Sequence, residues 1–158
     1  MVQFDWKFIF LLVLLLLRAQ AEEKDTFIIT GEMRCEYPPF RFTMKIYEDD
    51  ICWDDLLSYS NPRTSETYVR AYTMNATDTK DDLYQTEYEL VMIIFHNCYD
   101  RSSGKTEDLR YRVPLGTFRS NDSIHRTRWS GNITDAETRR PSDWWCDNSA
   151  DVEYLEDD

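Results

Sequence analysis

The stretch Phe40–Tyr47, which reads FRFTMKIY, decides the fold class of this 158-residue chain. Its apolar side chains recur at every second position, and basic or hydroxyl-bearing side chains fill the positions between them. Successive side chains of a β-strand point to opposite faces of the sheet, whereas a helix would scatter these apolar groups around its circumference. The stretch therefore predicts a strand with one face in a core and the other in solvent.

The strand pattern recurs along the rest of the chain. Glu87–Cys98 is apolar on both faces, which favours a central buried strand and leaves a buried helix as the alternative. Gly31 is expected to mark a bulge or bend, and Pro38-Pro39 a turn. The other candidate strands are Thr26–Cys35, Thr67–Tyr72, Asp108–Pro114 and Trp129–Thr134, with acidic connections at Asp50–Leu57 and Thr77–Leu83. About seven short strands predict an all-β fold, an antiparallel β-sandwich.

Residues 1–21 have the layout of a secretory signal peptide. Lys7 precedes ten unbroken apolar residues, Phe8–Leu17, and Ala19-Gln20-Ala21 supplies a cleavage pattern. A membrane anchor is the alternative, but ten helical residues span only about 15 Å, roughly half of a bilayer core. We therefore expect a secreted, extracellular protein that does not span a membrane, with its domain at 22–135 and an acidic, disordered tail at 136–158.

Cysteines and sequons fit the same extracellular interpretation. An even number of cysteines in a secreted chain favours two disulfides, and four cysteines allow three pairings. Their spacing matches no zinc-ligand pattern. Sequons make three asparagines candidates for glycosylation. The disulfide candidates are Cys35, Cys52, Cys98 and Cys146, and the glycosylation candidates are Asn75, Asn121 and Asn132.

Charge and motif content point to binding rather than catalysis. The net charge of −12 disfavours nucleic acid as a partner, because a polyanion would be repelled at long range. The chain has no Gly-x-Ser-x-Gly, His-Glu-x-x-His or phosphate-loop motif. We therefore expect a protein that is not an enzyme and holds no cofactor or metal.

Several of these residues resemble the transthyretin-like family of secreted nematode proteins. Gly31–Cys35 is similar to the Gly-x-x-x-Cys strand with which that family opens. Ile94–Cys98, which reads IFHNC, resembles the family's Ile-Tyr-His-Asp-Cys-Asn block, so that His96 and Cys98 are the family-motif residues. Tyr111–Pro114 resembles the strand that ends in an Ile-Pro step, and Trp129–Ile133 faintly resembles the terminal strand.

The chain also departs from that family. Thr67–Tyr72 stands where the family has a Gly-x-Phe hairpin. The second cysteine that follows the His-x-Cys block is missing from Gly104–Asp108, and Cys52 has no counterpart. A rewired pairing of Cys35 with Cys146, and of Cys52 with Cys98, is the working hypothesis.

The resemblance implies a transthyretin-type sandwich and a secreted binding or signalling protein. Such a protein would engage a small hydrophobic ligand, a lipid or a cell-surface receptor. A secreted hydrolase on the same fold, using His96, is the alternative. We favour a structural His96 beside a disulfide, because an oxidised cysteine offers no thiolate.

Three further groups have both a functional and a structural interpretation. The acids of Glu48–Asp55 suggest calcium or a solvated loop, with the loop preferred. The pair Trp144-Trp145 suggests a partner anchor or, preferably, packing on the domain itself. Basic residues could bind an anionic partner or pair with the abundant acids, the preferred interpretation. They are Lys105, Arg110, Arg112, Arg119, Arg126 and Arg128.

Overall fold

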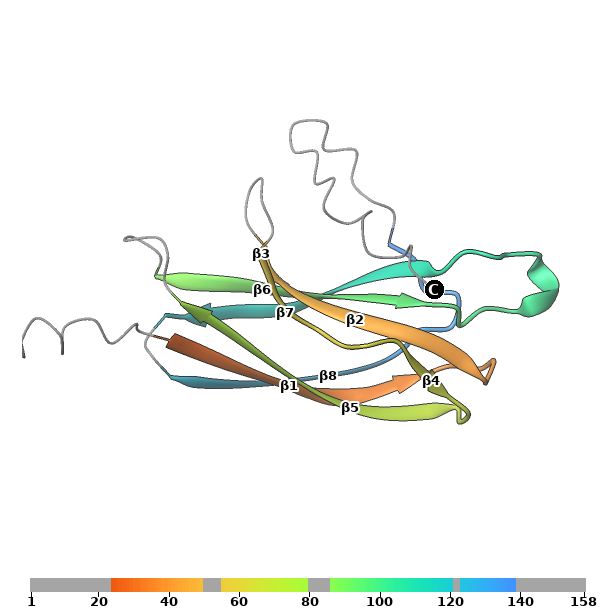
Figure 1. Ribbon diagram of the computed structural model, residues 1–158, viewed down its shortest axis with the longest axis horizontal. Helices are drawn as coiled ribbons and strands as arrows, with labels where there is room; N and C mark the ends of the chain where they lie inside the picture. Colours follow the sequence, from red (N-terminus) through yellow and green to blue (C-terminus); the bar gives the residue numbers. More distant parts are fainter. Residues whose placement is uncertain (1–23, 50–54, 80–85, 121–122, 139–158) are drawn as a thin grey trace, which may run out of the picture.

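Two stacked β-sheets make up the protein (Figure 1). The computed structural model describes residues 24–49, 55–79, 86–120 and 123–138. Three strands, in the order β5-β1-β8, form one sheet; the other has the order β3-β2-β6-β7, with β4 also pairing with β2. Their bounds are β1 (Lys24–Arg34), β2 (Phe40–Glu48), β3 (Asp55–Tyr59), β4 (Arg63–Ser65), β5 (Val69–Thr79), β6 (Glu87–His96), β7 (Leu109–Arg119) and β8 (Ile124–Asn132), and one 3₁₀ turn covers Arg101–Ser103. The predicted all-β sandwich is confirmed.

The core lies between the two sheets and follows the alternation in the sequence. Phe40, Phe42 and Met44 of β2 are almost wholly buried, whereas Arg41 between the first two is exposed and Thr43 between the last two is half-buried. From the opposite sheet, β1 contributes Phe27 in the same period of two. Facing strands that each contribute every second side chain produce a two-layer hydrophobic core.

Strand β6 is central, as its composition predicts. It pairs antiparallel with β2 on one side and with β7 on the other. Leu90, Met92 and Ile94 point into the core, while Val91 and Ile93 form a second buried cluster on the outer face. Because every backbone group of a central strand is paired within the sheet, an apolar run on both faces is tolerated there. The helical alternative for this segment is wrong.

The antiparallel expectation holds for the larger sheet and fails for one pair in the smaller sheet. Strand β1 pairs antiparallel with β5 but parallel with β8, from Thr26 beside Ile124 to Arg34 beside Asn132. The first and last described strands are therefore neighbours. Strand β8 also begins five residues before the predicted Trp129, because its residues alternate between half-buried and exposed without an apolar face.

Two strand ends also differ from the prediction. Strand β7 continues past Pro114 to Arg119, because the proline sits at a bulge where the register shifts between Leu90 and Val91. Gly116 follows with φ 113°, a backbone conformation that glycine adopts without a steric penalty. The acidic connection predicted to begin at Thr77 is instead the end of β5, and part of Asp50–Leu57 belongs to β3.

Gly31 is a site of close approach rather than the predicted bulge. The β1 register with both neighbours is uninterrupted through this residue. A Cβ atom placed at Gly31 would lie 1.6 Å from the carbonyl oxygen of Trp129 and 2.9 Å from the Tyr72 hydroxyl. That hydroxyl donates to the same Trp129 carbonyl over 2.9 Å. Glycine is required here because the Tyr72 ring and the β8 backbone occupy the space of a side chain.

We expect Gly31→Ala to lower the free energy of unfolding by about 3 kcal/mol or more, because the added methyl group forces two backbone strands apart. Urea denaturation of the purified protein measures this loss. Gly104→Ala is the control, since a Cβ at Gly104 meets nothing within 4 Å and only the positive φ is unfavourable, at about 1 kcal/mol. Equal losses in the two variants would contradict the close-approach explanation.

Candidate functional site

A disulfide between Cys35 and Cys98 joins the two sheets. Cys35 directly follows β1, Cys98 lies two residues beyond β6, and their Cα atoms are 5.8 Å apart. Both cysteines are buried. The working hypothesis that paired Cys35 with Cys146 and Cys52 with Cys98 is therefore wrong, because β1 and β6 end at the same end of the sandwich (Figure 1). Cys52 and Cys146 lie outside the described residues.

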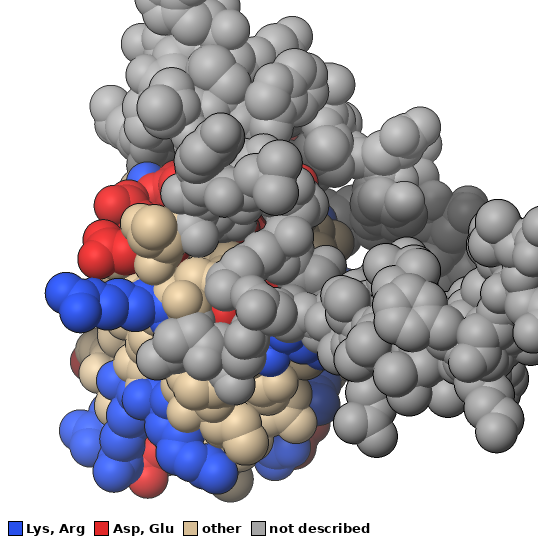
Figure 2. All heavy atoms as spheres, turned by 90° about the vertical axis from the view of Figure 1, so that its left-hand side faces the viewer, with Lys and Arg blue, Asp and Glu red and all other residues tan. Residues whose placement is uncertain are grey.

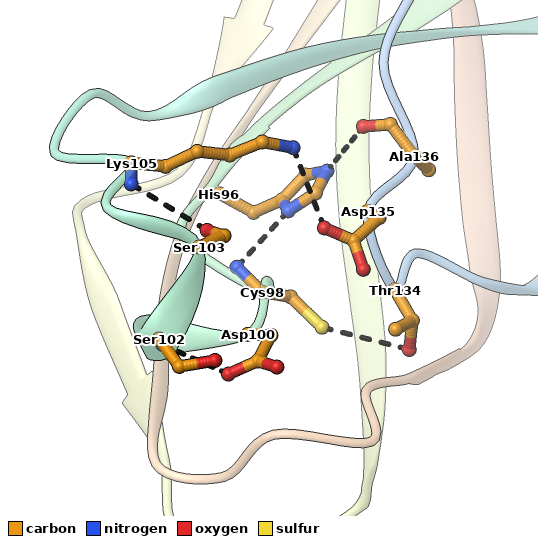
Figure 3. A network of polar contacts seen from close by, with 9 residues as sticks. All are labelled: His96, Cys98, Asp100, Ser102, Ser103, Lys105, Thr134, Asp135 and Ala136. Carbon is orange, nitrogen blue, oxygen red and sulfur yellow. Dashed lines mark hydrogen bonds and ion pairs between the residues drawn. The ribbon is translucent and has the colours of Figure 1, made fainter.

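His96, the last residue of β6, is wholly buried. Figure 3 shows its ring beside Cys98, one of the two residues of this disulfide. Its Nε2 lies 2.9 Å from the carbonyl oxygen of Ala136, and its Nδ1 lies 3.2 Å from the backbone nitrogen of Cys98. A carbonyl only accepts and an amide only donates, so Nε2 carries the proton and Nδ1 accepts. These two contacts fix the neutral imidazole in one tautomer.

The segment after β8 covers this histidine. Asp135, at φ 53°, donates its backbone N–H to the Cys98 carbonyl over 2.9 Å, and its carboxylate lies 3.4 Å from the Lys105 ammonium. Thr138 continues across to β7, where its N–H donates to the Arg110 carbonyl over 2.7 Å. Residues 136–138, predicted to belong to a disordered tail, thus still contact the domain, and they help to close His96 off from solvent.

This arrangement supports structure rather than catalysis. A substrate cannot reach a side chain with no exposed surface, and the neighbouring sulfurs are oxidised. Burial lowers the pKa of His96, while the nearby Asp108 and Asp135 carboxylates and the Ala136 carbonyl act in the opposite direction. The predicted position of His96 beside a disulfide is confirmed, although its disulfide partner is Cys35.

A second polar cluster, at the opposite end of the sandwich, escaped the sequence analysis. Asp25 is wholly buried, and its carboxylate oxygens lie 3.0 Å from His125 Nε2 and 3.2 Å from the Ser120 hydroxyl. The His125 ring stacks on Phe27 at a centroid distance of 5.1 Å. The sequence did contain one signal for the burial of Asp25. This residue lies two positions before Phe27, so the alternation of β1 places it on the same inward face.

The contacts of this cluster do not make a catalytic triad. Ser123 Oγ lies 3.2 Å from His125 Nε2, the same nitrogen that faces Asp25. A charge-stabilised general base needs its carboxylate on one ring nitrogen and its nucleophile on the other. Rotating the His125 imidazole ring by half a turn would place a carbon atom, and not the second ring nitrogen, where Nε2 now lies. The cluster therefore joins β1 to the β7–β8 connection and does not activate the serine.

Five of the six predicted basic residues divide into two groups, and the sixth, Arg110, is half-buried on β7. Arg112 pairs with Asp49, Arg119 with Glu87 at 3.8 Å, and Lys105 with Asp135. All three lie on β7 or on the loop before it. Internal pairing, the preferred interpretation, is therefore confirmed for these residues.

Arg126 and Arg128 of β8 are different. Both are exposed, and neither forms an ion pair with the described part of the chain. They lie on the outer face of the three-stranded sheet. For these two arginines, the interpretation as internal ion pairs has no support within the described residues.

Two of the three sequon asparagines lie on that same outer face. Asn75 is an exposed residue of β5. Asn132 ends β8, where its side-chain oxygen accepts from the hydroxyl of Thr134, the third sequon residue, at 2.7 Å. Both positions are open to attachment of a bulky glycan. Asn121 lies outside the described residues, as do Trp144 and Trp145.

The acidic segment does not gather into a site within the described residues. Glu48 is buried at the end of β2, and Asp49 pairs with Arg112. Asp50 and Asp54 lie outside the described part of the chain. In the part that is described, no three His, Cys, Asp or Glu side chains are placed to hold a metal ion together.

Comparison with known proteins adds no relative: no family model, curated protein or solved structure matches this chain. Within the described residues there is also no helix with the length and apolar content needed to cross a membrane. We therefore infer function from the chemistry of the surface and of the buried contacts.

Replacing both Cys35 and Cys98 by alanine should lower the free energy of unfolding by about 4 kcal/mol, because the bond closes a loop of 63 residues in the unfolded chain. Chemical denaturation of wild type and variant measures the difference. Peptide mapping without reduction should recover a Cys35–Cys98 fragment from the wild type, and a Cys35–Cys146 fragment would contradict the assignment.

The stability contributed by a neutral His96 should depend on pH. Its pKa is lowered in the fold from the ordinary value of 6.5, so this contribution is complete above about pH 6.5 and decreases as the pH falls through the folded pKa. Unfolding free energies measured between pH 7.5 and 4.5 should show a smaller decrease in His96→Gln than in wild type. His125→Gln should retain the His96-dependent part, and an unchanged profile in His96→Gln would contradict this explanation.

Proposed function

We propose that this chain is a secreted extracellular binding protein, with a sandwich of the kind found in the transthyretin-like family, that engages a cell-surface receptor through its exterior. The observation that carries the proposal is the buried Cys35–Cys98 disulfide. Disulfides of this structural kind persist in oxidising compartments and are rare in the cytosol. The signal-peptide layout of residues 1–21 supports the same localisation.

Support for the family comes from what the disulfide connects. The two joined cysteines are those of the Gly-x-x-x-Cys and His-x-Cys segments, on which the resemblance rests. His96, from the second segment, packs against the same junction. Cys35 from the first motif and His96 and Cys98 from the second thus meet at one buried junction, although the two cysteines are 63 residues apart in the sequence. A chance similarity of short motifs would not require them to meet.

Recognition at the exterior is favoured over an internal ligand. The space between the sheets is filled by side chains such as Ile29, Met44 and Met92, each with no exposed surface. A small hydrophobic ligand or a lipid would have to displace several of them, and emptying or overfilling a packed core costs several kcal/mol. A receptor that contacts an outer face requires no such rearrangement.

The hydrolase alternative has less support. It depends on His96, which is covered by the Ala136 segment and lies beside an oxidised cysteine. The other histidine shares a single ring nitrogen between Ser123 and Asp25. Neither arrangement supplies a nucleophile together with a base that is positioned to activate it.

Expression of the full chain in insect cells tests this proposal. We expect the protein in the medium, beginning at Glu22, with an oxidised Cys35–Cys98 bond and carrying glycans on Asn75 and Asn132. When added back to intact cells, it should bind saturably to their surface, as measured with an antibody on unpermeabilised cells. A variant lacking Phe8–Leu17 is the control and should stay inside the cells. Intracellular wild type with reduced thiols, or no binding to any cell surface, would contradict the proposal.

A further inference from the structure

The outer face of the three-stranded sheet carries a row of basic side chains, which we call the cationic track. Its members are Lys24 and Arg34 of β1 and Arg126 and Arg128 of β8, all exposed. They share one face because each stands at an even position of strands that are paired in register, Ile28 beside Arg126 and Thr30 beside Arg128. The face has one acidic member, Glu32, on β1 between the level of Arg128 and Arg34.

No member of the cationic track forms an ion pair with a described residue. In contrast, four basic side chains that do form ion pairs with described carboxylates belong to the other sheet and its loops: Arg41, Lys105, Arg112 and Arg119. Figure 2, which views the end where β1 begins, shows basic side chains gathered on the side of the three-stranded sheet, and more of the acidic ones towards the other sheet. Arg63, Arg70 and Arg101 also lack an ion pair with a described residue, but the outer face of the three-stranded sheet carries four such side chains in one row.

The charge of the whole chain does not remove this local field. The described residues contain 13 basic and 15 acidic side chains, so they are nearly neutral, and the large excess of acid lies in the rest of the chain. Exposed charges farther away than about 8 Å are largely screened at physiological ionic strength. A partner that reaches the cationic track will therefore experience mainly its four positive charges and the single negative charge of Glu32.

The spacing of the cationic track suits an extended polyanion. Arg126 and Arg128 are two residues apart on one strand, which places them about 7 Å apart at about 3.3 Å per residue. Lys24 and Arg34 lie about 13 Å beyond them on either side by the same measure, counted along β1. A guanidinium group binds a planar or tetrahedral oxyanion through two parallel hydrogen bonds. A chain with an oxyanion about every 7 Å could engage the central pair together.

We propose that the cationic track binds a sulfated polysaccharide, an inference that rests on the proposed extracellular function and names the chemistry of the cell-surface partner. Sulfate esters remain ionised at every physiological pH, and a polysaccharide presents them repeatedly along an extended chain. Between the basic residues the face carries hydroxyl groups that match sugar hydroxyls as hydrogen-bond partners. The outward-facing hydroxyl residues are Thr26, Thr30, Thr73, Thr77 and Ser130.

Other polyanions fit this face less well. An acidic peptide of comparable affinity needs pockets for buried anchor side chains, and a sheet face of threonines offers none of the aromatic hot spots found in such interfaces. An anionic membrane would be met by only four charges, each worth about 1 kcal/mol near such a surface, and the nearby Ile124 is the only large exposed hydrophobic residue on β8.

A glycan at Asn75 is compatible with this site. Asn75 pairs with Ile28, which in turn pairs with Arg126, so the asparagine lies two strands away, about 10 Å across the sheet. A glycan there covers the β5 side of the face. A glycan at Asn132 would cover the Arg34 end of the face, but Arg128 lies four residues away along β8, about 13 Å, so the central arginines stay open.

Binding of the secreted, full-length protein to immobilised heparin tests the proposal. The wild type should bind, and the logarithm of its affinity should fall linearly with the logarithm of the salt concentration. Arg126→Gln combined with Arg128→Gln should weaken binding about tenfold at 0.15 M NaCl and reduce the salt slope by about two. The matched control is Arg63→Gln with Arg119→Gln, which removes two exposed charges from the other sheet and should leave affinity and slope unchanged. Equal thermal unfolding curves exclude misfolding as the cause.

Three results would overturn this inference. The first is equal loss of binding in the two double variants, and the second is unchanged binding to chemically desulfated heparin. The third is tighter binding of the wild type to polyglutamate or to vesicles containing phosphatidylserine than to heparin. If the wild type ignores heparin but still binds cells treated with heparin lyases, the polysaccharide is wrong and the receptor proposal stands. Absence of any cell binding removes both.

Discussion

One covalent bond, between Cys35 and Cys98, holds the two sheets together at one end of the sandwich, and the local structure there depends on it. It fixes the chain just after β1 against the chain just after β6, so the backbone of Cys98 can donate to the neutral His96 ring. The segment after β8 then closes over that ring through Ala136 and Asp135. Covalent bond, buried imidazole and closing segment form one unit, and loss of any part exposes polar groups that the others satisfy.

Charge is distributed unequally between the two sheets. On the larger sheet, β7 places Arg112 and Arg119 beside carboxylates, and these pairs neutralise its surface. The smaller sheet keeps its single wholly buried carboxylate, Asp25, on the inner side with His125 and carries Lys24, Arg34, Arg126 and Arg128 on its outer face. That outer face holds one acidic side chain, Glu32, against four basic ones, which is the charge imbalance on which the proposed recognition of a polyanion rests.

Alternation was sufficient to predict the sandwich, because β1, β2 and β6 carry apolar groups at every second position or on both faces. The alternation of apolar residues did not predict the full length of β8, because its sequence IHRTRWSGN has no apolar face. The inward side chains of this strand, such as His125 and Trp129, are only half-buried. The disulfide could not be derived from spacing, because its partners meet through topology alone. The environment of Asp25 was also out of reach, since His125 lies 100 residues away in the sequence. Long-range contacts, rather than local patterns, decided each difference.

The parallel pairing of β1 with β8 has a consequence for biosynthesis. Thr26 and Ile124 are neighbours in the sheet although almost the whole described chain separates them. On a ribosome the first strand emerges long before its last partner exists, so one edge of β1 must wait, unpaired, until residue 132 has emerged. Exposed strand edges readily recruit other chains. A nascent protein of this topology therefore has an obligatory interval in which one edge of its first described strand is open to other chains.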